Sequence, residues 1–191
     1  IPVVHTYHTV YEDYTHYFIP SKRAGKKLVS VASKTFASFC DRIIVPTYKT
    51  KKLLLTYGIS DGMIDIIPTG INIPELCDKK LLRKSLGIDE DAKVLLYLGR
   101  LGAEKNIQEI MAYYDRLKDD SIKLFIVGGG PYLKTLKEDA DQISKEVVFT
   151  GMVDANSVNR YYQAADIFTT ASTSETQGLT YYEALANGTI A

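Results

Sequence analysis

Two carboxylates near the end of the chain have the type and spacing of a sugar-binding site. Glu175 and Glu183 lie eight residues apart, with Gly178 between them. Apolar residues recur at helical spacing from Leu179 onward, so Glu175 is expected on a loop and Glu183 on the following helix. Backbone amides at a helix start attract phosphate, and carboxylates accept hydrogen bonds from sugar hydroxyls. The pattern suits a nucleotide-sugar pocket; the alternative is a helix whose acids complement its dipole.

Two cations follow an earlier strand. Arg100 and Lys105 come after a strand predicted to end at Gly99. Ligands of open parallel sheets bind beyond the carboxyl ends of such strands. The Arg fork and the Lys ammonium can together hold a diphosphate and neutralise charge that builds on a departing nucleotide. The alternative is a pair of solvated surface cations.

A glycine run occupies another strand-to-helix junction. Gly128, Gly129 and Gly130 precede Pro131, which suits a first helical turn. Missing side chains let a ligand approach the backbone, which makes Gly130 a candidate for ligand contact; the alternative is a tight turn. The run is not a dinucleotide fingerprint, because Leu133 occupies the position of the third glycine. A P-loop is also excluded, because its Lys and Ser or Thr are absent.

Two histidines follow the first expected strand. His5 and His8 are three residues apart, so in a regular strand they point to opposite faces and cannot share a metal ion. A histidine facing a cleft can donate to a sugar hydroxyl or a phosphate oxygen; the alternative is a structural role. The acidic triplet at 89–91 precedes a strand and is interpreted as an exposed turn. No metal site is expected.

Strand and helix patterns alternate along the chain. The expected strands cover 3–4, 42–46, 64–68, 94–99, 123–127, 147–149 and 167–170. The expected helices cover 28–39, 49–57, 76–87, 105–118, 131–143, 157–165 and 179–186, with helical spacing also over 11–18. This alternation predicts an α/β protein with parallel sheets. The chain begins on a strand and stops after a helix, which predicts a fragment whose sheets are incomplete.

Composition narrows the class of protein. The chain has 191 residues, 46% of them hydrophobic, so it can bury a core. No apolar run approaches the roughly 20 residues that span a bilayer, and the amino end lacks the charged start of a signal peptide. Cys40 and Cys77 lie apart without metal-ligand spacing. A reduced, cytoplasmic protein is therefore expected.

Positive charge gathers in the first third of the chain. Residues 14–60 contain nine Lys or Arg and only one acid, Asp41, whereas the whole chain has zero net charge. The basic residues of one amphipathic segment are Lys22, Arg23, Lys26, Lys27 and Lys34, and its aromatic residues are Tyr14, Tyr17, Phe18, Phe36 and Phe39. This segment is typical of a helix on an anionic membrane surface. An ordinary solvated face is the alternative; nucleic-acid binding is not expected, because no nucleic-acid motif is present.

Together these motifs resemble the retaining glycosyltransferases of group 1, which have the GT-B fold. The resemblance is carried by His8, Gly-Arg-Leu at 99–101, Glu-Lys-Asn at 104–106, Gly-Gly-Gly-Pro at 128–131 and the segment from Glu175 to Glu183. It covers essentially the whole chain. The segments at 5–9, 11–14 and 174–180 look like the diacylglycerol glucosyltransferase branch.

The resemblance implies roles for single residues. Arg100 and Lys105 would bind the donor diphosphate, and Glu183 would bind the ribose. Glu175 would bind the transferred sugar, and His8 would face that sugar from the other domain. The backbone of Gly178 and Leu179 would contact the sugar and phosphate region. The family transfers the sugar with retention, by same-face attack assisted by the leaving phosphate, without a divalent metal or a prosthetic group. Gln177 stands where many relatives have an aromatic residue or Pro, which leaves the donor sugar open.

The resemblance also implies two Rossmann-like domains, both incomplete here. Residues 1–72 would be the C-terminal part of the acceptor-side domain, 73–90 a linker and connecting helix, and 91–191 the nucleotide-sugar domain without its C-terminal end. The implied function is transfer of glucose from UDP-glucose to a membrane lipid such as diacylglycerol, giving an α-glycolipid at the inner face of the cell membrane. A soluble sugar acceptor and a non-catalytic nucleotide-sugar binding module remain alternatives. Transfer requires groups from both domains, so the activity of the fragment alone stays open.

Overall fold

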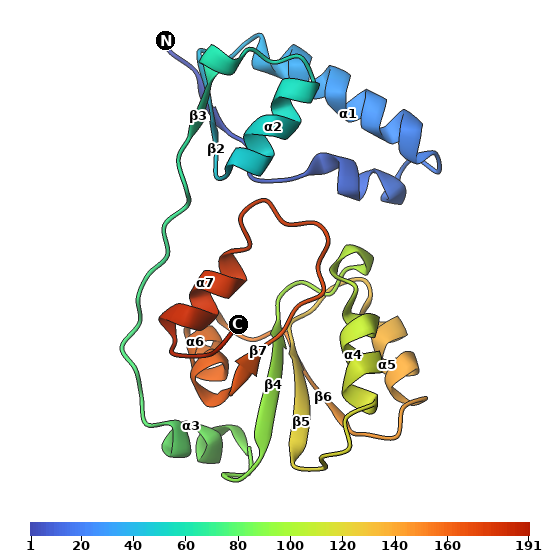
Figure 1. Ribbon diagram of the computed structural model, residues 1–191, viewed down its shortest axis with the longest axis vertical. Coiled ribbons are helices and arrows are strands. Elements are labelled where there is room, and N and C mark those ends of the chain that lie inside the picture. The colour runs from blue at the N-terminus through green and yellow to red at the C-terminus, as the bar shows by residue number, and fades with distance from the viewer. The chain divides into compact units, whose positions relative to one another are not determined.

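The computed structural model describes the backbone of residues 1–191 and every side chain except those of His16 and Tyr17. The chain forms two compact units: unit 1 comprises Ile1–Gly70 and Ser174–Gly178, and unit 2 comprises Ile71–Thr173 and Leu179–Ala191. Each unit has its own parallel sheet with helices packed on it (Figure 1). The expected α/β class with parallel sheets is thus confirmed, whereas the expected domain and linker ranges stay predictions.

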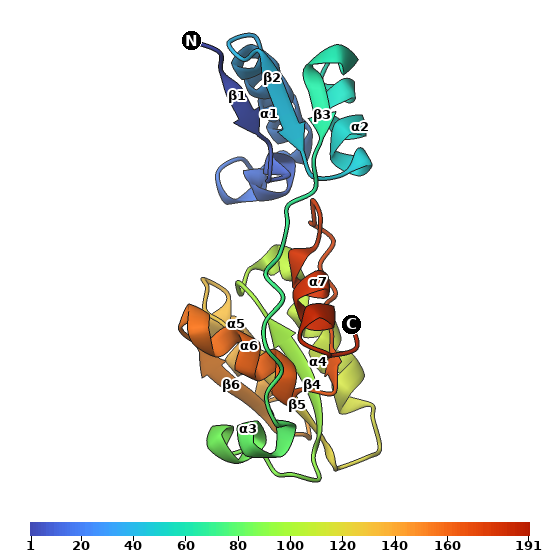
Figure 2. The ribbon, with the colours of Figure 1, turned by 90° about the vertical axis from the view of Figure 1, so that its left-hand side faces the viewer.

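Unit 1 has a three-stranded parallel sheet of order β1-β2-β3. The strands are β1 (Val4–Thr6), β2 (Arg42–Val45) and β3 (Ile64–Ile66), and the helices are η1 (Tyr11–Tyr17), α1 (Lys22–Ala37), α2 (Tyr48–Thr56) and η2 (Asp61–Met63), where η marks a 3₁₀ helix. Figure 2 shows α1 passing behind β1 and β2, with α2 beside β3. The core between these layers includes Val29 of α1, Ile43 and Val45 of β2, and Leu54 of α2.

The first long helix begins earlier than the sequence pattern indicated. The expected helix started at residue 28, but α1 starts at Lys22 because the Ser21 side chain caps it by accepting the Ala24 amide at 3.4 Å. Gly25 then lets η1 approach closely, since a Cβ at Gly25 would lie 2.5 Å from Thr15 Oγ1. The basic residues at 22–27 therefore lie on a regular helix whose first turns are fixed against η1.

Unit 2 has a four-stranded parallel sheet of order β6-β5-β4-β7. Its strands are β4 (Lys93–Leu98), β5 (Ile122–Val127), β6 (Val147–Gly151) and β7 (Ile167–Phe168). Its helices are α3 (Lys79–Leu86), η3 (Ala103–Lys105), α4 (Ile107–Asp115), α5 (Leu133–Ala140), α6 (Ala155–Ala164) and α7 (Leu179–Ala186). Figure 1 shows α4 and α5 on one face of this sheet and α6 and α7 on the other.

The alternation of side chains along β4 builds both halves of the unit 2 core. Val94 and Leu96 pack on the α6 and α7 face with Tyr162, whereas Tyr97 packs on the opposite face with Ile126 of β5. All five side chains are nearly inaccessible to solvent. A strand buried on both faces reads as a continuous apolar run, as residues 94–98 do.

Several helix starts in unit 2 differ from the expected ones for local reasons. α3 begins at Lys79 rather than at residue 76, because Asp78 caps it by accepting the Leu81 amide at 3.0 Å. α4 begins at Ile107 rather than at 105, because Asn106 adopts a left-handed conformation with φ 50°. Pro131 stands before the start of α5 at Leu133 rather than inside its first turn. α7 covers the expected residues 179–186.

A charged cluster around Asp166 ties α3 to the sheet of unit 2. Asp166 Oδ2 accepts both the Val94 amide and Arg83 Nη2 at 2.7 Å, and Oδ1 accepts Lys79 Nζ at 2.7 Å. The Arg83 side chain is only 7% exposed. Burial alone raises the pKa of Asp166, but the hydrogen bonds from Lys79 and Val94 and the two positive charges hold that pKa below its ordinary value.

Replacing Asp166 by Asn is expected to lower the free energy of unfolding by about 2 to 3 kcal/mol at pH 7, because it leaves Arg83 buried without its counter-charge. This is less than a fully buried pair would lose, since the Asp166 side chain is 39% exposed. Because the native pKa is lowered, the wild-type advantage is present above the unfolded pKa of about 3.9 and lost as the pH falls through the native pKa. Urea unfolding followed by circular dichroism measures the free energy of unfolding of the wild type and of Asp166→Asn at pH 7 and at pH 3. If the two proteins differed by the same amount at both pH values, this account would be contradicted.

Candidate functional site

The strand order of unit 2 reverses at β4. The chain passes from β4 to β5 and β6 on one side, then returns to the other side of β4 as β7. The loops after β4 and β7 therefore part between two neighbouring strands, which is where ligands of open parallel sheets bind. The first loop carries Arg100 and Lys105, and the second leads into α7 with Leu179 and Glu183.

An ion pair orients Arg100 on the loop after β4. Arg100 Nη2 lies 2.6 Å from Glu104 Oε1, and the side chains of Arg100 and Glu104 are 45% and 4% exposed. Gly102 makes room for the buried carboxylate, because a Cβ there would overlap both Glu104 oxygens. Lys105 ends η3 on the same loop and is half-buried. The loop thus carries an oriented guanidinium and an ammonium, two groups that suit an anionic ligand.

The glycine run after β5 packs against the Arg100 loop. A Cβ at Gly128 would overlap the Gly99 carbonyl oxygen, and a Cβ at Gly130 would overlap that of Leu101. The Leu101 amide in turn donates to the Gly129 carbonyl at 2.9 Å. The close contact of the two loops thus explains the glycines through packing within the chain. Gly130 itself is exposed, and its contact with a ligand stays a prediction.

Glu183 lies on the second turn of α7 and is hydrogen-bonded to a residue of α6. Gly178, with φ 72°, allows the turn that precedes the helix. The hydroxyl of Tyr162 donates to Glu183 Oε2 at 3.0 Å. Burial, and then the neighbouring charge of Glu183, raise the pKa of Tyr162 well above its ordinary value. Tyr162 is therefore a hydrogen-bond donor to the carboxylate throughout the physiological pH range.

A buried tyrosine of β4, Tyr97, supports the loop that carries Arg100. Its hydroxyl donates to the carbonyl of Arg100 at 3.0 Å. The backbone at Arg100 and the carboxylate of Glu183 are therefore both supported by buried tyrosines of unit 2.

The loop that carries Glu175 belongs to unit 1 and is fastened there. Thr47 Oγ1 donates to the Thr176 carbonyl at 2.8 Å, and Thr176 Oγ1 donates to the His8 carbonyl at 2.9 Å. The Gln177 side chain bonds both the amide and the carbonyl of Thr69, each at 2.9 Å. The structure thus brings the backbone of His8 and the Glu175 loop together in unit 1, and assigns Gly178 to the same unit.

The two histidines after the start of β1 have different surroundings. His8 is exposed, whereas the ring of His5 packs edge-on against Phe36, with ring centres 4.8 Å apart. Burial, and then the charge of His8, lower the pKa of His5. Among the described residues, no three His, Cys, Asp or Glu side chains gather closely enough to hold a metal ion.

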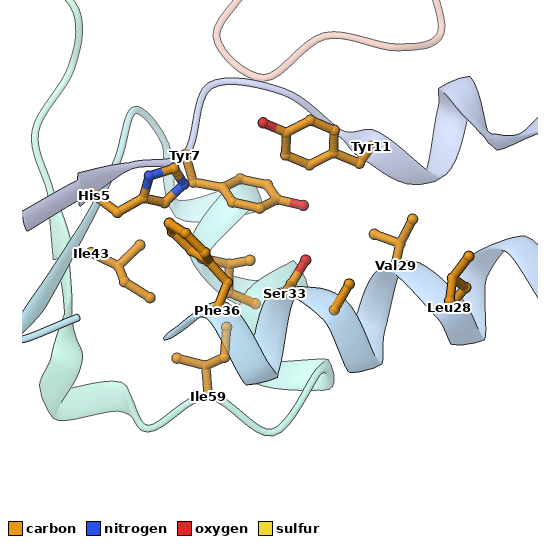
Figure 3. A pocket seen from close by; sticks show the side chains of 11 residues that line it. His5, Tyr7, Tyr11, Leu28, Val29, Ser33, Phe36, Ile43 and Ile59 are labelled. Carbon is orange, nitrogen blue, oxygen red and sulfur yellow. The ribbon is translucent and has the colours of Figure 1, made fainter. Parts of the chain in front are cut away.

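An apolar pocket of about 410 Å³ lies between α1 and the sheet of unit 1. Figure 3 shows the hydroxyls of Tyr7, Tyr11 and Ser33 along this pocket, with His5 and Phe36 nearby. Tyr7 is 4% exposed, and its hydroxyl has no hydrogen-bond partner within the described part of the chain. The pocket adjoins β1, an edge strand of the described sheet. Apolar surface beside a strand edge is normally covered by further protein or by an apolar ligand.

The basic residues of α1 are exposed, as are several apolar ones beside them. Lys22, Arg23, Lys26 and Lys27 all face solvent, although Lys26 Nζ also lies 3.1 Å from Glu12. The exposed apolar residues nearby are Phe18, Leu28, Val31, Phe36 and Phe39. Tyr17, another residue expected in this segment, lies outside the described side chains. No helix within the described residues is both long and apolar enough to cross a bilayer.

Sequence reasoning missed several residues that support the site. Glu104, the partner of Arg100, was detectable, because acids and bases four residues apart commonly pair. Tyr162 and Thr47 had no such signal, since each acts on a residue at least 21 positions away along the chain. In the sequence, Tyr162 falls within the helix expected at 157–165, and Thr47 shortly precedes the one expected at 49–57.

Known proteins match both units. Residues 78–191 match the family of glycosyl transferases group 1, and residues 1–74 match glycosyltransferase family 4. The alpha-monoglucosyldiacylglycerol synthase of Streptococcus pneumoniae is 44% identical over 99% of this chain and 45% of its own length. The synthase of the same name from Acholeplasma laidlawii is 37% identical over 97% of this chain and 50% of its own length. The chain thus spans about half the length of these relatives.

A solved structure shares the fold. Anabaena HepE, in complex with UDP and glucose, aligns with a TM-score of 0.80 over 98% of this chain and 51% of its own, at 18% identity. The resemblance drawn from the motifs, including the diacylglycerol glucosyltransferase branch, is confirmed by these matches. The chain therefore belongs to the group 1 glycosyltransferases and has their GT-B fold.

Proposed function

We propose that the full-length protein transfers glucose from UDP-glucose to diacylglycerol, or to a glucosylated diacylglycerol, with retention at the anomeric carbon. The observation that carries this proposal is the similarity, over nearly the whole chain, to two proteins named alpha-monoglucosyldiacylglycerol synthase. The choice of UDP-glucose as the donor is supported by the UDP and glucose bound in the HepE complex.

The unit 2 residues are suited to the donor. In this proposal Arg100 and Lys105 bind the diphosphate, Glu183 binds the ribose, and backbone groups at Gly130 and Leu179 approach the phosphate and sugar. The helix start at Leu179 adds the partial positive charge of its amides, with Gly178 preceding it. These groups would neutralise the charge that builds on UDP as it leaves, which lowers the barrier to transfer.

The proposed reaction proceeds on one face of the sugar. The bond between the anomeric carbon and the β-phosphate oxygen breaks as an acceptor hydroxyl oxygen bonds to that carbon from the same side. The hydroxyl proton passes to the departing phosphate oxygen, so the products are an α-glucoside and UDP. Glu175 and His8 are assigned to the transferred sugar, where a carboxylate accepts hydrogen bonds from sugar hydroxyls and an imidazole donates one.

An assay of UDP release tests the proposed acceptor. The full-length protein is mixed with UDP-glucose and with anionic vesicles with or without diacylglycerol, and in parallel with a panel of soluble sugars. Release that depends on diacylglycerol supports the proposal. UDP release only with a soluble sugar would contradict the lipid acceptor. A protein that binds UDP but never releases UDP from UDP-glucose, whatever the acceptor, would be a non-catalytic module.

The basic face of α1 is the proposed membrane contact, at the inner face of the cell membrane. Lys22 and Arg23 lie in the first turn of α1, which carries no acid, so they oppose the helix dipole. A nearby anionic surface would relieve that repulsion. Exposed Leu28 and Val31 offer apolar contacts beside these charges.

Replacing Lys22, Arg23 and Lys27 by Gln in the full-length protein is expected to weaken binding to anionic vesicles about a hundredfold, since each basic residue contributes about 1 kcal/mol. Vesicle flotation at low salt measures this partition. The matched control replaces Lys84, Lys118 and Lys137, exposed lysines of unit 2, by Gln. Equal binding by the two triple variants would exclude α1 as the membrane contact.

A further inference from the structure

Tyr162 occupies a core position where only its ring is needed for packing. It is fully buried, and its ring lies 5.7 Å from that of Phe168, between centres, within the apolar cluster under α6 and α7. A phenylalanine would fill the same space. The hydroxyl, in contrast, lies 3.0 Å from Glu183 Oε2. Its position therefore calls for an explanation beyond packing.

The surroundings hold both partners of this hydrogen bond in place. Thr189 Oγ1 donates to the Tyr162 carbonyl. Asn187 donates to the Glu183 carbonyl through its side chain at 2.9 Å and through its backbone at 3.1 Å. Gln163, the neighbour of Tyr162, donates to Asn187 Oδ1 at 2.9 Å. The two helices thus form a rigid support under the carboxylate, as a preorganised site requires.

We propose that Tyr162 is a positioning residue that fixes one oxygen of Glu183 and so presents the other to the vicinal diol of the nucleotide's ribose. This inference rests on the proposed function, which assigns the ribose to Glu183. A carboxylate has two oxygens, and a flexible Glu loses side-chain entropy when a ligand orders it. A hydrogen bond already made in the free protein removes part of that cost. The hydroxyl would therefore contribute to nucleotide affinity without touching the nucleotide.

Calorimetric titration of the full-length protein with UDP and with 2′,3′-dideoxy-UDP tests this role. Tyr162→Phe is expected to weaken UDP binding about two- to tenfold, because binding must then order the Glu183 side chain that the hydroxyl holds in the wild type. Dideoxy-UDP, which lacks the diol, is expected to bind the variant and the wild type equally. In steady-state assays the KM for UDP-glucose rises, while kcat changes less than threefold. The melting temperature of the variant verifies its fold.

The Glu183→Ala variant completes the test. Once Glu183 is absent, adding Tyr162→Phe is expected to change UDP affinity no further, because the hydroxyl acts only through the carboxylate. Unchanged UDP binding by Tyr162→Phe would overturn the inference, as would an equal loss of UDP and dideoxy-UDP, which indicates a structural role. If the wild type binds UDP but Glu183→Ala binds it equally well, the ribose assignment fails as well. A folded wild type that binds neither UDP nor UDP-glucose would overturn both the inference and the proposed function.

Discussion

Replacing Glu175 by Ala in the full-length protein is expected to lower kcat for glucosyl transfer about 10²- to 10³-fold. The proposal places this carboxylate at the transferred sugar, where the charge distribution changes most during the reaction, and single groups at such positions have effects of this size. The affinity for UDP is expected to stay within threefold, because UDP lacks the sugar that Glu175 is assigned to bind. Rates at saturating UDP-glucose, with UDP calorimetry alongside, measure the two quantities separately.

The hydrogen bonds that hold the Glu175 loop explain why Glu175→Ala should lower kcat. The two residues after Glu175 are held in place, because the Thr176 carbonyl accepts from Thr47 and the Gln177 side chain bonds the backbone of Thr69, so the carboxylate starts from a defined position. Glu138→Ala is the control, because Glu138 is an exposed carboxylate of α5 whose surface ion pair with Lys134 is 3.7 Å long. Unchanged transfer by Glu175→Ala would exclude this residue from the site. A loss confined to UDP affinity would reassign it to the nucleotide.

Replacing Arg100 by Ala is expected to weaken UDP binding about 10- to 100-fold and to lower kcat/KM for UDP-glucose by at least as much. Charge-assisted hydrogen bonds contribute about 1.5 to 3 kcal/mol, and each 1.4 kcal/mol is a tenfold change in affinity. Arg100→Lys is expected to recover only part of the loss, because the ammonium lacks the bidentate fork. Calorimetry with UDP and with uridine separates the diphosphate from the rest of the nucleotide.

Uridine supplies the internal control for Arg100. It lacks the diphosphate, so its affinity is expected to be the same for the wild type and Arg100→Ala. Arg116→Ala is the matched variant, since Arg116 is exposed at the end of α4 with its guanidinium 5.6 Å from the centre of the Tyr113 ring. Loss of uridine binding by Arg100→Ala would indicate a disturbed loop, because release of buried Glu104 could distort it. Unchanged UDP binding would remove Arg100 from the donor site.

The fold was largely predictable because its signals are local. Apolar strands such as 94–98 and the glycine before α7 identify elements within a few residues, and α7 was expected at the observed boundaries. The errors concern helix boundaries: three helices end two or three residues before the expected position, and at two starts a capping side chain, Ser21 or Asp78, outweighs the apolar pattern. The parallel pairing followed from the alternation of strands and helices alone.

The candidate site was predictable in its exposed residues but not in its supports. Arg100 and Glu175 lie at strand-to-helix junctions, which the sequence marks through Gly99 and Gly178, and Glu183 lies on the helix that follows Gly178. The hydrogen bond from Thr47 to Thr176 joins residues 129 positions apart, and no local pattern encodes such a pairing. The same holds for the packing of Gly130 against Leu101, which gives the glycine run a structural reason that its sequence position did not reveal.

The chemical structure of the product tests the central claim most directly. The full-length protein is mixed with UDP-glucose and anionic vesicles containing diacylglycerol, and the extracted lipid is analysed by mass spectrometry and by proton NMR of the anomeric position. The account predicts diacylglycerol heavier by one hexose unit, or by two if a second sugar is added, with the α configuration. A β-linked product would contradict retention, and unmodified lipid beside a glucosylated soluble acceptor would contradict the lipid acceptor.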